Sequence, residues 1–224
     1  MKCILLTSIG VFTYVIGICQ TKTSDNKNFT LLREIDSSGY FLTGELPNKA
    51  NRLKYNLISR DEFNYSPREV LYWTNALIIN TANGQTTKHF STGLNAVYPV
   101  SNTVEINKYD WTYNSYQRTP VSGMSKTHLI FLVKSDELNK DGVLDDEDPI
   151  SIYLTDKKGN GLKRITESSM NVVGWSLSKD CKTIIALIQV DKNGDKKFSD
   201  EEEALFIIKL EEDFSKIKLA KVIE

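Results

Sequence analysis

Short apolar segments separated by polar turns recur along the second half of the chain. They are rich in β-branched and aromatic residues and are bounded by Asp, Asn, Gly and Lys. The clearest are Thr127–Val133 (THLIFLV), Ile150–Leu154 (ISIYL), Thr183–Val190 (TIIALIQV) and Ala204–Leu210 (ALFIIKL). This length and composition are typical of β-strands. We therefore expect an all-β fold built from antiparallel strands.

The strand pattern repeats after 54 residues. The register aligns Leu129 with Thr183, Phe131 with Ile185, Asn139 with Asn193, Asp141 with Asp195 and Leu154 with Ile208, without a gap. Each copy consists of a strand, an acidic loop, a strand, a turn and a strand. Such a unit buries its apolar face only against neighbouring copies, so the repeat predicts a stack of small sheets.

Two acidic loops occupy the corresponding place in the two copies, Glu137–Asp148 (ELNKDGVLDDED) and Asp191–Glu202 (DKNGDKKFSDEE). Their spacing of oxygen-bearing side chains resembles the EF-hand loop, which binds Ca²⁺ through side-chain oxygens and one backbone carbonyl. The predicted calcium ligands are Glu137, Asn139, Asp141, the Val143 carbonyl, Asp145 and Asp148 in the first loop, and Asp191, Asn193, Asp195, the Lys197 carbonyl, Ser199 and Glu202 in the second. The apolar eighth residues, Leu144 and Phe198, are expected to point into the core.

Each loop also departs from the EF-hand pattern. The first has glycine at the sixth position, Gly142, but begins with Glu137, or with Asp136 if the chain contains a one-residue bulge. The second has Lys196 at the sixth position, where a positive φ is expected and lysine is disfavoured. Nearby lysines also oppose a cation, so we expect the second loop to bind more weakly. The alternative is that both loops are solvated acidic hairpins without metal.

Two consecutive stretches, Ile152–Thr166 (IYLTDKKGNGLKRIT) and Val172–Ile188 (VVGWSLSKDCKTIIALI), resemble the TolB-like β-propeller repeat. In that family a strand ending in Asp-x-x-Gly leads to a Leu-x-x-Leu-Thr strand, and a Trp-Ser-Pro-Asp-Gly-Lys turn opens the next blade. The residues that match this turn are Trp175, Ser178, Asp180 and Lys182. Cys181 replaces its glycine, which would have allowed a strained backbone.

The resemblance implies a propeller-like array of about three to four antiparallel blades, closed as a small propeller or left open. Ala76–Thr92 is a looser, earlier copy with an Asn83-Gly84 turn signal. The longer interval before the next copy indicates that Asn107–Pro120 is an insertion.

Residues 1–19 have the pattern of an export signal. The apolar run Ile4–Ile18 is shorter than a comfortable transmembrane helix. The stretch that ends at Cys19 resembles a bacterial lipobox, so lipid on Cys19 and cleavage after it are the two alternatives. We expect residues 20–30, most of them polar, to form a flexible tether and residues 31–224 to form one domain. We expect the protein in the bacterial periplasm, on the outer membrane through a lipid anchor, or outside the cell.

Composition and charge exclude other classes of function. The chain has 224 residues, of which 40% are hydrophobic and 25% charged, as in one globular domain. Its net charge of −1 gives no excess of positive charge for nucleic acid. Export leaves at most Cys19 and Cys181, so we expect no disulfide framework.

Catalytic motifs are sparse, and we expect no enzyme. The sequence has two histidines, His89 and His128, and the second lies in an apolar strand, where a structural role is more common than a catalytic one. Gly174–Ser178 begins like a nucleophile elbow but lacks its closing glycine.

An aromatic segment is the other candidate for binding. It contains Tyr109, Trp111, Tyr113, Tyr116 and Arg118. Binding loops use this composition to stack on sugars or peptides, whereas packing between blades is the plainer interpretation.

The sequence thus predicts an exported calcium-binding scaffold, propeller-like and non-catalytic, with a protein or glycan partner. Membrane contact is expected only through a lipid anchor. Two alternatives remain open. One is a helical EF-hand pair in which Ser199–Leu210 is an exiting helix that starts with a capping box. The other is a carbohydrate-binding accessory module that uses the aromatic segment.

Overall fold

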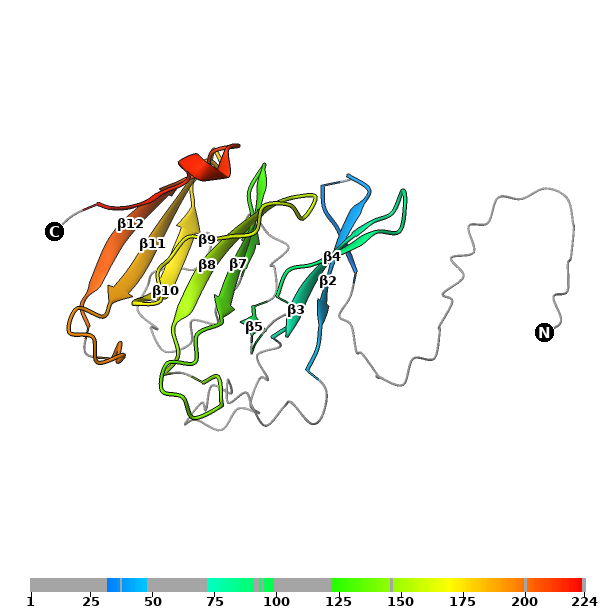
Figure 1. The fold of residues 1–224 in the computed structure, drawn as a ribbon. Helices are drawn as coiled ribbons and strands as arrows, with labels where there is room; N and C mark the ends of the chain where they lie inside the picture. The colour runs from blue at the N-terminus through cyan, green and yellow to red at the C-terminus, as the bar shows by residue number, and fades with distance from the viewer. Residues whose placement is uncertain are drawn as a thin grey trace, which may run out of the picture.

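The computed structural model describes residues 32–36, 38–47, 72–90, 93, 95–98, 122–145, 147–199 and 201–222. These residues form three antiparallel sheets, arranged in a row (Figure 1). Within them there is one 3₁₀ turn, η3 (Phe214–Lys216), and no α-helix. None of the described segments is a helix long and apolar enough to cross a membrane. The all-β prediction is confirmed.

The first sheet has the order β1-β2-β3-β4. Its strands are β1 (Arg33–Glu34), β2 (Tyr40–Glu45), β3 (Asn75–Asn80) and β4 (Thr86–Lys88). Gly44 in β2 gives the Trp73 ring the room it needs, since a Cβ at position 44 would lie 2.0 Å from that ring. Strands β3 and β4 form the hairpin predicted from the Asn83-Gly84 signal, with Gly84 at a φ of 71°.

The second and third sheets contain the two copies of the repeat. The second is built from β5 (Ala96–Val97), β6 (Gly123–Met124), β7 (His128–Lys134), β8 (Ile150–Asp156) and β9 (Lys163–Arg164), and the third from β10 (Met170–Leu177), β11 (Thr183–Val190), β12 (Glu203–Lys209) and β13 (Leu219–Lys221). All four segments with the strongest strand pattern are therefore strands. Because Glu203–Lys209 is β12, the exiting helix of the EF-hand alternative is wrong.

Residues 178–182 form the turn between β10 and β11. The Ser178 hydroxyl contacts the Asp180 carboxylate at 2.5 Å and accepts a hydrogen bond from the Thr183 N–H at 2.9 Å. Cys181 has a φ of 61°, so the cysteine adopts the left-handed conformation that the glycine would have supplied.

Neighbouring sheets pack against one another through two apolar cores. Residues Leu129, Phe131 and Val133 of β7 pack in one core with Leu42 and Ile78 of the first sheet. The other face of β7 belongs to a second core, shared with the third sheet. The members of that core on β7, β8, β11 and β12 are Ile130, Leu132, Ile152, Leu154, Ile184, Ala186, Ile188, Phe206 and Ile208. Strand β7 is therefore buried on both faces.

Equivalent residues of the two copies lie in the same core. Ile130 and Ile184 are equivalent in the repeat, and both are buried in the core shared by the second and third sheets. In a head-to-tail stack of blades, one face packs against the opposite face of the next blade, so equivalent residues would lie in different cores. The third sheet thus meets the second through the same face, and the described strands do not close into a ring.

Polar contacts join the sheets at the end opposite the acidic loops. Lys157 pairs with Asp36 and connects the second sheet to the first. The Lys163 ammonium donates hydrogen bonds to the carbonyls of Phe214 and Ile217, at 2.7 and 3.0 Å, and connects the second sheet to the third.

Several predictions concern residues outside the described part of the chain. These are the export signal 1–19, the tether 20–30, lipidation at Cys19, and the aromatic residues Tyr109, Trp111, Tyr113, Tyr116 and Arg118.

Candidate functional site

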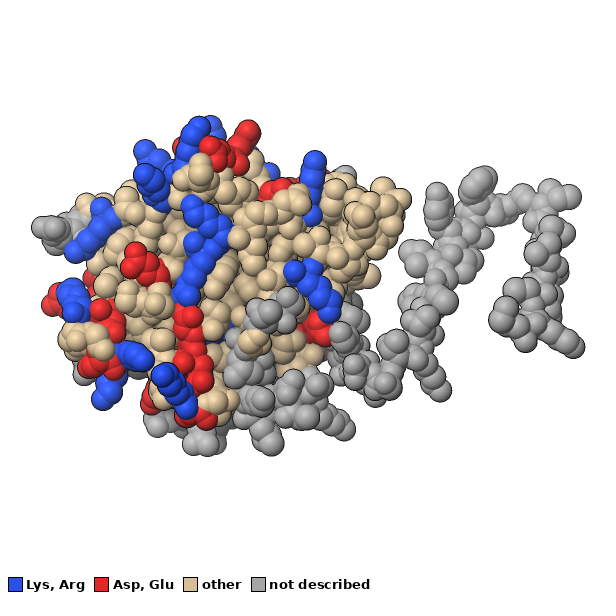
Figure 2. Space-filling view, in the orientation of Figure 1, with Lys and Arg blue, Asp and Glu red and all other residues tan. Residues whose placement is uncertain are grey.

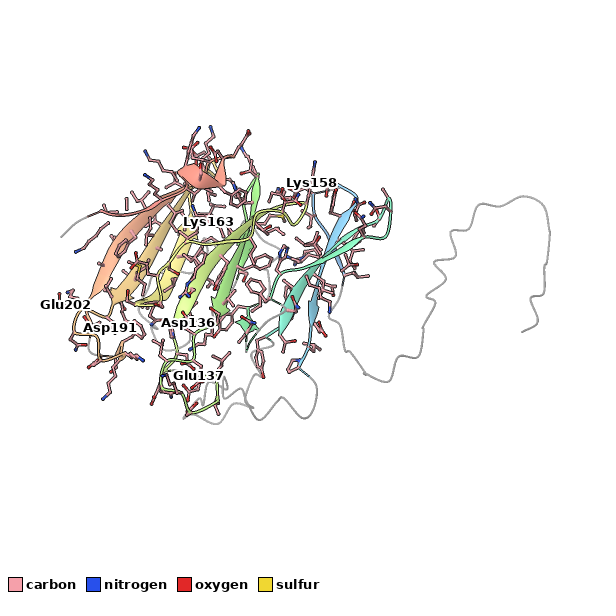
Figure 3. The ribbon with its side chains drawn as sticks, viewed as in Figure 1. Asp136, Glu137, Lys158, Lys163, Asp191 and Glu202 are labelled. Atoms are coloured by element: carbon pink, nitrogen blue, oxygen red, sulfur yellow. The ribbon has the colours of Figure 1, made fainter. Side chains whose placement is uncertain are left out.

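The two acidic loops connect equivalent strands and lie at the same end of their sheets. The first joins β7 to β8 and the second joins β11 to β12. Figure 3 shows Glu137 of the first loop and both Asp191 and Glu202 of the second at this end. The side drawn in Figure 2 has acidic and basic side chains interspersed around these loops, with no large patch of one sign.

Side-chain oxygens of the first loop bind its own backbone in successive tight turns. Glu137 accepts the Gly142 N–H at 3.1 Å, Asn139 accepts the Asp141 N–H at 3.2 Å, and Asp141 accepts the Val143 N–H at 2.7 Å. Such short-range hydrogen bonds from Asp, Asn and Glu side chains satisfy backbone N–H groups that no neighbouring strand pairs with. Asp136 instead pairs with Arg164, so Glu137 is the first position of this loop.

The second loop repeats this hydrogen-bond pattern position by position. Asp191 accepts the Lys196 N–H at 3.0 Å and also the Gly194 N–H at 2.7 Å. Asn193 accepts the Asp195 N–H at 2.8 Å, and Asp195 accepts the Lys197 N–H at 2.9 Å. The first, third and fifth positions thus have the same role in both loops.

Both loops place a left-handed residue at the fourth and at the sixth position. In the first loop these are Lys140, with a φ of 62°, and Gly142, with a φ of 82°. In the second they are Gly194, with a φ of 77°, and Lys196, with a φ of 65°. The positive φ expected at Lys196 is therefore present. Each loop has glycine at one of the two positions and accepts the cost of a left-handed lysine, about 1–2 kcal/mol, at the other.

The eighth residue of each loop is buried, as predicted. Leu144 is fully buried and packs with Ala96 and Tyr72. Phe198 is also buried. Leu144 thus holds the first loop against Ala96 of β5, at the edge of the second sheet.

The twelfth position is where the loops differ most. Asp148 is buried, and its two carboxylate oxygens accept the N–H groups of Leu138 at 2.9 Å and Asp145 at 3.0 Å. Burial raises the pKa of Asp148, while these hydrogen bonds and the nearby Lys134 act in the opposite direction. Asp148 therefore fastens the two ends of the first loop together. Its equivalent in the second loop, Glu202, is exposed.

A buried lysine completes the first loop. Lys134, at the end of β7, is 3% exposed, and its ammonium donates hydrogen bonds to the carbonyl oxygens of Asp145 and, at 2.6 Å, Asp148. Charge-assisted hydrogen bonds of this kind are stronger than neutral ones. The equivalent residue in the third sheet is the buried Ile188. Lys134 thus fastens the first loop, a role that the sequence analysis missed.

The donor types suit calcium, although the carboxylates are not gathered around a common point. Within the described ranges, no three His, Cys, Asp or Glu side chains lie close enough together to hold a metal ion. The remaining donors of an EF-hand-like loop are amide, hydroxyl and backbone oxygens. In the second loop the Asn193 amide contacts the Asp195 carboxylate at 3.2 Å, and Asp191 binds the backbone N–H groups of Gly194 and Lys196.

The two histidines lie away from the loops. His128 is buried in β7, as predicted, and contacts the Thr127 hydroxyl at 2.8 Å through Nδ1. The His89 Nε2 atom is buried, and no hydrogen-bond partner for it occurs in the described part of the chain. Burial lowers the pKa of both histidines, and the negative charge of Asp156 partly offsets this.

Comparison of this chain with family models, with curated proteins and with solved structures found no match in any of the three.

Proposed function

We propose that this protein is an exported, non-catalytic β-sheet scaffold in which calcium binding to the second acidic loop stabilises the β11–β12 hairpin. The observation that supports this most directly is the backbone of that loop. Its hydrogen bonds at the first, third and fifth positions and its left-handed fourth and sixth residues arrange oxygens of the type that Ca²⁺ prefers.

The second loop is favoured over the first, which reverses the ranking expected from the sequence. In the first loop Asp148 is 2% exposed, whereas Asn139 and Asp141 are exposed, so its buried carboxylate is not available to join them around a cation. The Lys134 ammonium also brings a positive charge to the carbonyl oxygens of that loop. In the second loop Glu202 is exposed, and the hydrophobic Ile188 replaces the lysine.

Calcium would act there as a structural staple. Asp191 directly follows β11 and Glu202 directly precedes β12, so a cation that binds both ties the ends of the two strands together. It would also remove the repulsion between their carboxylates. At a calcium concentration about tenfold above the dissociation constant, one such site adds about 1.4 kcal/mol of stability.

The scaffold role draws on the TolB-like resemblance and on the export signal. Stacked blade-like sheets expose loops and faces to which a protein or glycan partner can bind. The export signal and its lipobox-like end support a place in the bacterial envelope or outside the cell, where calcium is available at about millimolar concentration to sites of modest affinity.

Calcium titration of the mature chain, from residue 20, tests this proposal. Asp195→Asn removes a charge and keeps the oxygen that accepts the Lys197 N–H, and Asp141→Asn is the matched change in the first loop. We expect millimolar calcium to raise the melting temperature of the wild type and of Asp141→Asn, and to leave Asp195→Asn unchanged. Absence of both binding heat and thermal shift in the wild type would refute calcium binding. Loss of the response in Asp141→Asn alone would move the site to the first loop.

A further inference from the structure

The outer face of the third sheet is apolar and exposed. Residues Ile185 of β11 and Leu205 of β12 are 44% and 42% exposed, which is unusual for large hydrophobic residues in adjacent strands. Leu187 of β11 is paired with Leu205, and Ile207 of β12 is paired with Ile185, and both lie on the same face as these two residues. The four side chains form a continuous block at the centre of the face.

The equivalent face of the second sheet is already covered by a sheet. Phe131 is the equivalent of Ile185 in the repeat, and Tyr153 is the equivalent of Ile207. Both belong to the core that the second sheet forms with the first. The fold therefore covers this face in one copy of the repeat by packing a sheet on it and leaves it open in the other copy. A sheet is thus the element whose shape suits the open face.

Charges at the two ends of β12 indicate that the sheet complementary to this face is a second copy of the same sheet. The outward residues of this strand run Glu203, Leu205, Ile207, Lys209, with an acid at one end, a base at the other and leucine and isoleucine between. A two-fold axis perpendicular to the strand places β12 antiparallel to its own copy. Glu203 then faces Lys209 of the second copy, and Leu205 faces Ile207. The strand is complementary to itself in this orientation and not in the parallel one.

We propose that the outer face of the third sheet is a self-association surface, through which two copies of this chain pack face to face with their β12 strands antiparallel. Four strands about 4.8 Å apart and seven residues about 3.3 Å apart give a face of roughly 19 by 23 Å. The area of this face, roughly 440 Å², is smaller than the roughly 800 Å² that each partner buries in a standard interface. The dimer is therefore weak and concentration-dependent. The polar residues Thr183, Gln189, Glu203 and Lys209 form a rim around the apolar centre.

Sedimentation equilibrium on the mature chain, at concentrations from about 1 μM to about 1 mM, tests the surface. We expect a reversible monomer–dimer equilibrium. Glu203→Lys and Lys209→Glu each place like charges opposite one another and should weaken the dimer by at least about tenfold. The double variant Glu203→Lys/Lys209→Glu restores opposite charges and should recover most of the affinity. Matched controls are Glu167→Lys and Lys179→Glu, two exposed positions outside the face, which should dimerise as the wild type does.

The variant Leu205→Thr tests whether the dimer can be lost while the fold is retained. This variant should keep the far-ultraviolet spectrum of a β protein and remain monomeric throughout the concentration range. A wild type that is monomeric throughout would overturn the proposal, as would growth beyond a dimer. Failure of the double charge swap to recover the affinity lost in the single variants would overturn the antiparallel arrangement.

Discussion

The buried ammonium of Lys134 provides the sharpest test of how the first loop is held. Lys134→Met keeps an unbranched side chain of similar length and removes the charge. The two carbonyl oxygens of Asp145 and Asp148 then lose their charge-assisted donor, and the buried Asp148 carboxylate loses its nearest positive charge. The matched control is Ile188→Met at the equivalent position of the third sheet, which changes shape but no charge.

The expected size follows from these contacts. Each hydrogen bond to a charged group contributes about 1.5–3 kcal/mol, and the lost desolvation cost of the lysine offsets part of that. We expect Lys134→Met to lower the free energy of unfolding by about 3 kcal/mol. In a domain of this size that corresponds to a decrease in melting temperature of roughly 6–12 °C. Ile188→Met should cost less than about 1.5 kcal/mol.

Urea denaturation of the two variants and of Lys134→Met/Asp148→Asn measures the effect. The double variant removes the unpaired carboxylate charge, so it should be more stable than the sum of the two single changes predicts. Calcium should raise the melting temperature of Lys134→Met as much as that of the wild type, since the proposed site is in the other loop. A loss of under about 0.5 kcal/mol in Lys134→Met would refute the reasoning, because surface substitutions have effects of that size.

Three further predictions follow from other parts of the fold. Gly44→Ala should lower the free energy of unfolding by about 3 kcal/mol in urea denaturation, because its Cβ would overlap the Trp73 ring. This loss of stability should be smaller in a Trp73→Leu background, and equal losses in both backgrounds would contradict the explanation. The pKa values of His89 and His128 are both lowered in the folded chain. Below about pH 6.5 the unfolded chain therefore binds protons that the folded chain does not, so the free energy of unfolding should decrease as the pH falls below 6.5. Above pH 6.5 these two histidines should have no effect on stability. Melting temperatures between pH 8 and pH 5 check this, and the decrease should shrink when both histidines are changed to asparagine. Lys196→Asn should raise stability without calcium by about 1 kcal/mol, because asparagine tolerates the left-handed backbone; a decrease would show that lysine carries no strain there.

Local structure could be predicted well from this sequence. The strands β7, β8, β11 and β12 follow from short β-branched segments between turn residues, and the acidic loops follow from the spacing of Asp and Asn. Their backbones were also foreseeable in part, since Gly142 marks the left-handed sixth position of the first loop. The matching signal in the second loop is Gly194 at the fourth position, which an EF-hand pattern does not consider.

The relative orientation of the sheets could not be predicted. Strand β11 has hydrophobic side chains on both faces, so alternation does not say which face meets the second sheet. The repeat favours head-to-tail stacking, whereas equivalent residues Ile130 and Ile184 share one core. That arrangement follows from packing over the whole molecule and has no local signature in the sequence.

The roles of Lys134 and Asp148 were hidden for a different reason. A carboxylate at the twelfth position of an acidic loop can bind a cation or accept backbone hydrogen bonds, and its residue type is the same in both cases. The lysine that distinguishes the loops precedes the first one in the chain, within an apolar strand. Only the fold shows that its ammonium reaches the far end of the loop.

Because β7 is buried on both faces, it links the unfolding of all three sheets. Separation of the first sheet exposes Phe131, and separation of the third exposes Ile130, so either event strips apolar contacts from the same strand. The backbone amides of β7 should therefore exchange with solvent only when the whole domain opens. A protein built from three small sheets gains, through this one strand, the cooperativity of a single folding unit.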